Sequence, residues 1–353
     1  MRINLLRRLK DHDIYLNIKK ASLPEQISQE FQRLQGPNHT LSYRAAKEVM
    51  KKHGVPEDEI IPHSRCKANR YCNHAWAPCE LDITDEWCYV SELLRTDGHI
   101  SKNQREVKLV SVDKGLAEKF TSIASKLGIQ NIRTEENKHD YRVRILDKTF
   151  AVILTEAFNI KPGNKSLTTT IPKWMRHLSK EQVKHCLQGA FDGDGSVQYD
   201  KKARTRRIRL NTGSENYAKD VKSWLDKLGI RSITFPDPRR KGRLFYLQIS
   251  KKEDIGIFHE RVKLNHKKRK EGLATLIKGY KRDGPGRRKE TILAFIRRHP
   301  KTTCTAISKA MKLSQSTTST HLKALEKEGK IKKEKLQQKK LITAAHHARP
   351  RAP

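Results

Sequence analysis

The sequence has little negative charge and no long apolar run. Among its 353 residues, 39 are Asp or Glu and 75 are Lys or Arg, which gives a formal net charge of +36 and an isoelectric point near 10.1. An enzyme of small metabolites does not need this excess, so we expect a polyanionic partner. No apolar stretch approaches the roughly 18 residues of a membrane span, and the first residues lack the apolar core of a secretory signal. These absences predict a cytoplasmic, nucleoid-associated protein without membrane contact.

The cysteines lack the spacing that is typical of a structural zinc site. Zinc-binding cysteines usually occur in pairs separated by two to four residues, whereas gaps of six, seven and nine positions separate four of the six cysteines here. Free, partly buried thiols in a reducing compartment are the favoured interpretation, with structural zinc as the alternative. The remaining Cys186 and Cys304 are predicted core residues. The cluster comprises Cys66, Cys72, Cys79 and Cys88, with His63 and His74 among them.

Residues 187–197 (LQGAFDGDGSV) carry the most informative pattern in the chain. Apolar residues upstream and within it recur at the spacing of one buried helix stripe, and Ser179 with Gln182 predicts a capping box at the helix start. Gly189 and Gly193 leave one helix face without side chains, so another helix can approach its backbone. The helix ends at Asp194, where a carboxylate meets the negative end of the helix dipole and costs stability. Residues placed at such a cost are often functional.

A weaker copy of this motif, residues 90–98 (VSELLRTDG), lies upstream. It ends on Asp97 and Gly98, 97 positions before Asp194 and Gly195. Each motif is followed by a strand, a helix that closes on Leu-Gly-Ile, two more strands and a further helix. The distance along the sequence from the motif glycine to the glycine of this Leu-Gly-Ile helix end is 30 residues in the first copy and 34 in the second. The shared order and spacing indicate an internal repeat.

The repeat resembles the single-chain, two-motif LAGLIDADG homing endonucleases over about residues 82–278. The second motif matches the family pattern at Gly189, Phe191, Asp192, Asp194 and Gly195. The resemblance implies an α+β fold in which two pseudo-symmetric αββαββα halves form a saddle over duplex DNA. It also implies that the motif helices meet at the centre through Gly189, Gly193 and Ser91. Asp97 and Asp194 would then be the catalytic ligands of Mg²⁺ or Mn²⁺.

The chemistry of strand cleavage is consistent with such a pair. Phosphodiester hydrolysis needs a metal-activated water and charge neutralisation at the phosphate, and carboxylates from two adjacent helices can hold Mg²⁺ with positions open for both. Two such sites would cut both strands. A single Asp-Gly pair is also typical of a helix-ending turn, and this alternative applies to Asp97 more than to Asp194.

Some positions depart from the family pattern. Glu92 stands where the family usually has a helix-packing glycine, and a buried carboxylate there costs several kcal/mol unless it is paired or turned outward. Thr169 occupies the position where many members carry an active-site lysine, with Lys165 one turn of register away. In the second half the corresponding catalytic lysine is either Lys267 or Lys268, and a solvated basic run is the alternative.

The strands of both halves alternate apolar residues with basic or polar ones. One face of each sheet should therefore pack under helices, and the other should reach phosphates and base edges. A solvated sheet face is the alternative, but the charge has the same sign in both halves. The predicted DNA-binding residues of these strands and loops are Lys108, Arg142, Arg144, Arg204, Arg207, Arg209, Arg239, Arg240, Lys241, Arg243, Tyr246 and Gln248.

The flanking segments complete the predicted domain plan. Residues 1–80 are expected to be basic and mostly helical, with helices at 23–34 and 42–53 that form either a small helix-turn-helix module or a cap on the next domain. The two halves should occupy residues 81–177 and 178–280. Residues 281–289 are predicted to be a Gly/Pro/basic linker and residues 344–353 a disordered tail.

Residues 290–343 show the pattern of a winged-helix domain, with helices at 290–299, 305–311 and 315–328 and a basic hairpin at 330–342. A helical bundle that binds protein is the alternative. The predicted core comprises Ile292, Ile296, Ile307, Leu322 and Leu325. The third helix should present to a DNA major groove Ser316, Thr317, Ser319, Thr320, His321 and Lys323.

We therefore expect a monomeric, metal-dependent, site-specific endonuclease that cuts both strands of DNA. The alternative is a DNA-binding transcriptional regulator that has kept the fold and lost cleavage, and a third is an intron RNA maturase. The retained Asp97 and Asp194 favour the enzyme, whereas Glu92, Thr169 and the winged helix favour the regulator.

Overall fold

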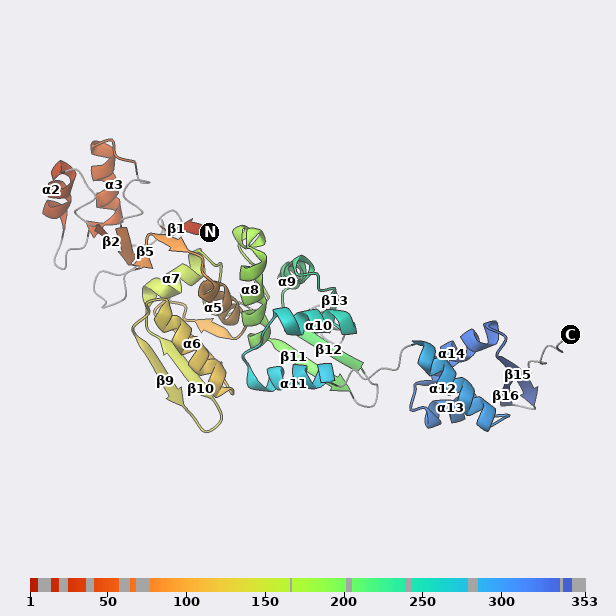
Figure 1. Cartoon of the computed structure of the whole chain (residues 1–353). Helices are drawn as coiled ribbons and strands as arrows, with labels where there is room; N and C mark the ends of the chain where they lie inside the picture. Colours follow the sequence, from red (N-terminus) through yellow and green to blue (C-terminus); the bar gives the residue numbers. More distant parts are fainter. Residues whose placement is uncertain are drawn as a thin grey trace. The chain divides into compact units, whose positions relative to one another are not determined.

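The computed structural model forms two compact units (Figure 1). The first holds the described residues up to Ile277 and the second those from Lys278 onward. None of the helices in these described parts has the length and apolar character needed to span a bilayer. The structure describes residues 1–5, 14–18, 25–35, 41–56, 64–67, 77–165, 167–200, 205–238, 243–278, 285–336 and 339–344.

The predicted repeat is confirmed as two αββαββα halves in the first unit. Each half contains one four-stranded antiparallel sheet, ordered β7-β8-β10-β9 in the first half and β11-β12-β14-β13 in the second. The first half comprises α5 (Asp85–Thr96), β7 (Gly98–Ile100), β8 (Val107–Ser111), α6 (Lys114–Lys126), β9 (Ile132–Glu136), β10 (Tyr141–Ile145) and α7 (Lys148–Glu156). The second comprises α8 (Lys180–Gly193), β11 (Gly195–Asp200), β12 (Thr205–Thr212), α9 (Glu215–Lys227), β13 (Ile233–Pro236), β14 (Phe245–Ile249) and α10 (Lys252–Arg261).

Two further elements attach to the halves. The 3₁₀ helix η3 (Lys173–His177) precedes α8. Helix α11 (Lys267–Lys278) follows α10 and was not predicted, because its first six residues are all charged or glycine and its apolar positions come late. It buries Leu273 and Leu276.

Helices α5 and α8 lie side by side between the two sheets (Figure 1). Their starts are fixed by capping side chains: Thr84 accepts a hydrogen bond from the backbone N–H of Trp87, and Ser179 forms the predicted capping box with Gln182. Both helices are buried along most of their length because each is covered on several sides. This pair forms the centre of the unit.

The sheets alternate as the sequence predicted. In the first half the residues that alternate with the arginines of β10, Val143 and Ile145, are fully buried, and α6 packs over this face. In the second half Ile208 and Leu210 of β12 are fully buried beneath α9. The basic positions therefore lie on the other face of each sheet.

The N-terminal segment corrects one expectation. Helices α2 (Glu25–Leu34) and α3 (Tyr43–Lys52) match the predicted ones, but strands make up much of the rest of the described part of this segment. It also contains a sheet of order β3-β2-β4-β5 and a strand pair β1-β6. Strands of two to four residues are too short to leave a detectable alternation in the sequence. These strands are β1 (Arg2–Asn4), β2 (Tyr15–Ile18), β3 (Leu41–Ser42), β4 (Ser64–Lys67), β5 (Ala77–Pro78) and β6 (Glu80–Asp82).

The second unit has the predicted winged-helix order. It comprises α12 (Pro285–Arg298), α13 (Cys304–Ala310), α14 (Gln315–Lys327) and the antiparallel hairpin β15 (Ile331–Leu336) and β16 (Lys339–Ala344). Lys312 adopts a φ of 50° in the turn before α14. The predicted core is confirmed, with Ile331 as an additional member. The predicted linker at 281–289 is corrected in part: residues 285–289 already belong to α12, because the charged residues before Glu290 continue the helix, whereas 281–284 lie outside the described residues. The tail beyond 344 also lies outside them.

Candidate active site and nucleic-acid interface

The two motif helices touch backbone to backbone. A Cβ atom on Gly189 would collide with the carbonyl oxygen of Tyr89, and one on Gly193 with the side chain of Thr96. Only glycine permits this approach, which explains the two glycines four positions apart in α8. The nearest α5 atoms come from Tyr89, Leu93 and Thr96. Ser91, predicted for this contact, is buried and donates instead to the carbonyl of Cys88 within α5.

The contact brings together the ends of the helices, where the two motif aspartates stand. Asp97 is the C-cap of α5 and Asp194 the C-cap of α8. Asp97 is exposed and Asp194 half-buried. Burial and then the negative charge of Asp97 raise the pKa of Asp194 to about 7, and partial loss of water raises the pKa of Asp97. The two carboxylates thus lie close enough for the charge of Asp97 to act on Asp194.

Two cations flank this pair at equivalent positions. The Lys165 ammonium donates hydrogen bonds to the carbonyl oxygens of Leu94 and Gly98 at the end of α5. The Arg269 guanidinium donates to the carbonyl oxygen of Phe191 (3.1 Å) and to that of Asp192 at the end of α8. Leu94 and Phe191 are 97 positions apart, the spacing of the repeat. Each motif helix therefore ends against a positive charge, which suits the helix dipole.

Both cations also act on the carboxylates. The positive charges of Arg269 and Lys165 lower the pKa of Asp97 and of Asp194, against the larger effect of burial. Burial and the charge of Arg95 lower the pKa of Lys165 to about 8. Lys165 therefore keeps its proton at neutral pH. The site combines two carboxylates with two cations.

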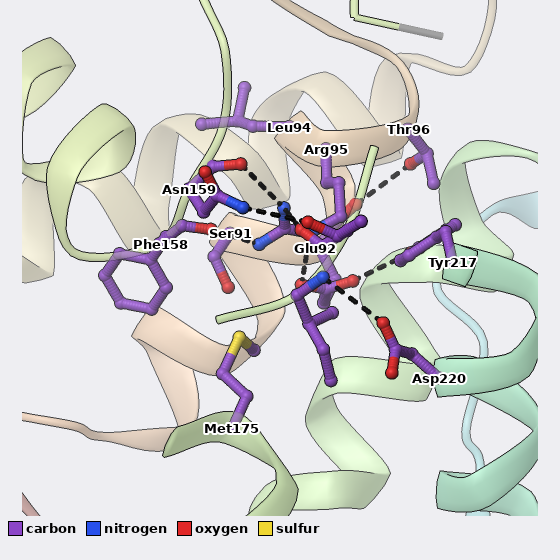
Figure 2. Close-up of polar contacts among 12 residues, drawn as sticks. Ser91, Glu92, Leu94, Arg95, Thr96, Phe158, Asn159, Met175, Tyr217 and Asp220 are labelled. Atoms are coloured by element: carbon purple, nitrogen blue, oxygen red, sulfur yellow. Dashed lines mark hydrogen bonds and ion pairs between the residues drawn. The ribbon is translucent and has the colours of Figure 1, made fainter. Parts of the chain in front are cut away.

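The segments next to these cations are anchored by two residues at equivalent positions with opposite charge. Arg95 donates from its guanidinium to the carbonyl oxygens of Phe158 (2.6 Å) and Thr170 (2.8 Å), on either side of Lys165 (Figure 2). Asp192 accepts from the backbone N–H groups of Asn265 (2.9 Å) and His266 (3.0 Å), just before Arg269. Arg95 and Asp192 are 97 positions apart. In the first half the cation Arg95 therefore binds backbone carbonyls. At the equivalent position of the second half, the anion Asp192 binds backbone amides.

Glu92 is buried and paired rather than turned outward. Its side chain is fully inaccessible, accepts from Nε of Arg95 at 2.8 Å and from the hydroxyl of Tyr217 at 2.7 Å, and so joins α5 to α9 (Figure 2). Burial and the charge of Glu92 raise the pKa of Tyr217, which keeps the phenol a donor. Glu92 is therefore compatible with close helix packing, because both of its carboxylate oxygens have hydrogen-bond partners, one on α5 and one on α9.

The lysine register predicted from sequence differs from the observed one. Thr169 is buried, and its hydroxyl donates to the carbonyl oxygen of Lys165 at 2.7 Å. Lys165 is the residue beside the carboxylates. The segment between α7 and η3 is irregular, so distance along the sequence does not fix which side chain reaches the helix ends.

Lys267 and Lys268, the candidate lysines of the second half, lie at the start of α11. Both are exposed and line a cleft of about 570 Å³ together with Asp113 and Tyr141. The second-half cation beside the carboxylates is Arg269. Nothing in the run of basic residues at 267–270 distinguishes Arg269 in the sequence, because only the start of α11 decides which side chain turns inward.

The predicted DNA-contacting residues of the strands lie on the open sheet faces. In the first half, Lys108 and Arg144 are cross-strand neighbours on β8 and β10, and Arg142 follows on the same face. In the second half, Arg209 stands opposite Gln248, with Arg207 and Tyr246 on the same face. Arg243 is exposed just before β14. Arg204, Arg239, Arg240 and Lys241 fall outside the described residues.

The third helix of the second unit presents the predicted polar side chains. Ser316, Thr320 and Lys323 are exposed, whereas Thr317, Ser319 and His321 are half-buried. Ser314 caps the helix by accepting from the backbone N–H of Thr317 at 3.1 Å. Burial and the charges of neighbouring basic residues lower the pKa of His321. This helix surface carries hydroxyl and amine donors suited to phosphates and base edges.

The cysteine cluster does not form a metal site among the described residues. Cys66, Cys79 and Cys88 are buried thiols without a disulfide. Within the described ranges, no group of three or more His, Cys, Asp or Glu side chains is placed to hold a metal ion. Cys72, His63 and His74 lie outside these ranges, so the zinc alternative stays a prediction.

Comparison with known families agrees with this geometry. A family model described as a LAGLIDADG-like domain matches residues 88–158 and 181–263, that is, both halves. The chain carries a LAGLIDADG-like domain in two parts. A second model, described as winged helix-turn-helix DNA-binding, matches residues 287–332. The match lies within the second unit and agrees with the winged-helix order of its elements.

Individual relatives of the LAGLIDADG-like chain are distant. It is 25% identical over 203 residues to the DNA-directed RNA polymerase subunit Rpo1C of Methanocaldococcus jannaschii, an alignment that covers 57% of this chain and 22% of that protein. The chain thus spans about a fifth of that relative.

Among solved structures, the homing endonuclease I-DmoI in complex with DNA and Mn is similar at 18% identity and a TM-score of 0.38, covering 51% of this chain and 97% of that one. Full-length WhiA from Thermatoga maritima is similar at 14% identity and a TM-score of 0.38, covering 70% and 92%. Similarity at this level transfers no activity or residue role to this chain.

Proposed function

We propose that this protein is a metal-dependent, site-specific DNA endonuclease whose centre is the Asp97 and Asp194 pair. The observation that carries the proposal is the meeting of these two carboxylates at the ends of α5 and α8, between Lys165 and Arg269. A protein that only reads DNA has no use for two neighbouring carboxylates that repel both each other and the phosphates. We further propose that it acts as a monomer at the nucleoid, because one chain supplies both halves.

The donor set fits Mg²⁺ or Mn²⁺. The centre offers two carboxylates, and Mg²⁺ is commonly held by one or two carboxylates with water and substrate phosphate completing its shell. Burial, and then the negative charge of Asp97, raises the pKa of Asp194, and the charges of Arg269 and Lys165 offset this only in part. Asp97 and Asp194 would hold the ion, which when bound supplies an activated water and neutralises charge at the phosphate.

The protein's own residues prepare the site. Lys165 and Arg269 place positive charge beside the carboxylates, where it attracts the scissile phosphates. Through hydrogen bonds to the backbone, Arg95 fixes the segment that contains Lys165, and Asp192 fixes the residues just before Arg269. The open faces of the two sheets offer donors on each side of the centre, which positions the duplex across it.

The test begins with selection of bound sites from a random duplex library. Wild-type protein is then incubated with the recovered site in Mg²⁺ or Mn²⁺, and products are resolved on denaturing gels. Asp97→Asn and Asp194→Asn should each abolish or greatly reduce cleavage while keeping binding, because the amide preserves shape and lowers the charge that holds the cation. Asp226→Asn, an exposed carboxylate on α9, is the matched control and should cleave normally.

Intact DNA after firm, site-specific binding by the wild type would refute the endonuclease. That outcome would support the second candidate function, a DNA-binding regulator, which the winged helix-turn-helix unit favours. Preferential binding of structured RNA in the same assay would instead favour the maturase.

A further inference from the structure

The open faces of the two sheets differ in how their arginines are paired. One buried cross-strand pair in each half aligns the two sheets: Val107 with Ile145 in the first half and Ile208 with Ile249 in the second. The basic positions follow directly after this pair. The next position pairs Lys108 with Arg144 in the first half and Arg209 with Gln248 in the second.

In the first half, carboxylates neutralise the arginines. Arg144 donates from Nε to Glu106 at 2.5 Å and from Nη1 to Glu135 at 3.4 Å. Arg142 pairs with Asp140, its Nε lying 3.2 Å from Oδ1. Hydrogen bonding to Glu106 raises the pKa of Arg144 and lowers that of Glu106. Three carboxylates thus accompany two arginines.

In the second half, the corresponding partners are neutral amides. Arg207 donates from Nε to the side-chain oxygen of Gln198 at 2.8 Å, and Arg209 donates from Nε to that of Gln248 at 2.7 Å. The guanidinium of Arg209 lies over the ring of Tyr246, 4.9 Å from its centroid. Burial and the charge of Arg207 lower the pKa of Arg209. The glutamines orient these arginines without removing their charge.

This difference changes what DNA gains at each half. A phosphate that meets Arg207 or Arg209 finds a cation that is hydrogen-bonded to a neutral amide, so binding releases counterions from the DNA. The carboxylate near Arg209 is that of Asp237, which accepts from the Tyr246 hydroxyl at 2.7 Å and not from the guanidinium.

A phosphate that meets Arg144 must displace Glu106 and Glu135, which exchanges one anion for another and brings two carboxylates close to the backbone. Such an exchange is favourable only where additional base contacts accompany it.

We propose that the two halves engage DNA unequally. Arg207 and Arg209 contribute affinity for duplex DNA of any sequence. Glu106 and Glu135 stay bonded to Arg144 unless a DNA half-site of the recognised sequence displaces them. Glu106 and Glu135 are thereby specificity-determining residues, although neither need contact a base. The inference rests on the proposed use of the sheets to bind DNA and does not require cleavage.

The first test compares the two arginine pairs in the full-length protein. Binding to duplex DNA of random sequence is measured as a function of salt for wild type, Arg207→Gln/Arg209→Gln and Arg142→Gln/Arg144→Gln. The second-half variant should reduce the slope of log K against log salt by about 2, one for each lost phosphate contact. The first-half variant should reduce it by less than about 1. Equal reductions, or the reverse order, would overturn the proposal.

The second test releases Arg144 rather than removing it. Glu106→Gln/Glu135→Gln should bind random duplex about fivefold more tightly and with a slope steeper by about 1, the contribution of one added phosphate contact. The matched control, Glu215→Gln/Asp226→Asn, makes the same change in net charge on α9. Its two carboxylates are likewise ion-paired, in their case with lysines. A gain no larger than that of the control would refute the role of Glu106 and Glu135.

The outcomes separate this inference from the proposed function. Unequal slopes in a protein that leaves its selected site intact would sustain the inference and refute the endonuclease. Cleavage of the selected site together with equal changes in salt slope for the two arginine variants would support the endonuclease and refute the inference. Thermal unfolding of each variant checks that the exposed substitutions leave the fold intact.

Discussion

Replacing Asp194 by asparagine should stabilise the metal-free protein at alkaline pH. Asp194 is half-buried at the C-terminus of α8, close to Asp97, and its pKa rises from an ordinary 3.8 to about 7. A raised pKa in the folded state means that the ionised carboxylate is less stable there than in the unfolded chain. Its contribution to stability is therefore fully present below about pH 3.8 and is lost as the pH rises to about 7. Asparagine removes this loss.

The magnitude follows from the size of the shift. A rise of roughly three pKa units corresponds to about 4 kcal/mol, an upper bound because solvent still reaches part of the side chain. We expect asparagine to raise the free energy of unfolding by about 1–3 kcal/mol near pH 8, after allowance for this screening. Near pH 5 the gain should be less than half as large, because the folded-state carboxyl of the wild type is then protonated.

Urea unfolding in the presence of EDTA, at both pH values, measures this difference. Mg²⁺ should then stabilise the wild type but not Asp194→Asn, since an ion that binds only the folded state shifts unfolding by mass action. Asp226→Asn, on the surface of α9, should change neither quantity. An Asp194→Asn variant that is less stable than the wild type near pH 8 without metal would refute the electrostatic account of this pair, as would a gain independent of pH.

Other changes to the chain test the packing of the motif helices, the pairing of Glu92 and the contribution of each unit to DNA binding. Gly189→Ala should lower the free energy of unfolding by about 3 kcal/mol or more in a urea titration, since its Cβ meets the backbone of Tyr89; Gly256→Ala in α10, where a Cβ meets nothing within 4 Å, should be neutral or slightly stabilising. Tyr217→Phe should cost about 2 kcal/mol because Glu92 loses a buried donor, whereas Tyr141→Phe, whose hydroxyl contacts Glu136 at the surface, should cost less than about 0.5 kcal/mol. Deleting residues 285–353 should weaken DNA binding in a gel-shift assay while any cleavage specificity stays with the remaining unit; complete loss of site recognition would place sequence reading in the winged helix and favour the regulator.

The sequence predicted those parts of the fold that depend on periodicity and repetition. The order of both halves followed from two motifs with the same downstream pattern, and the helix contact followed from Gly189 and Gly193. The N-terminal sheet was missed because its strands are too short to show alternation.

The candidate site was only partly predictable for a different reason. Asp97 and Asp194 close regular helices, so their positions follow from helix geometry. Lys165 and Arg269 reach the centre from segments whose path is set by tertiary hydrogen bonds. No local pattern in the sequence distinguishes them from neighbouring basic residues such as Lys268.

The same hydrogen bonds explain why Glu92 is present at all. At the position where α8 has Asp192, α5 has Arg95, which must bind carbonyls rather than amides to anchor its loop. A buried guanidinium needs a counter-charge, and the site three positions earlier on the same helix face can supply one. Glu92 occupies that site and corresponds to Gly189 of α8, where the anion Asp192 is satisfied by amide and hydroxyl donors and needs no such partner. The two departures, an arginine for an aspartate and a glutamate for a glycine, therefore belong together. Glu92 is thus a consequence of how the first half holds Lys165 in place, and it is compatible with an intact centre.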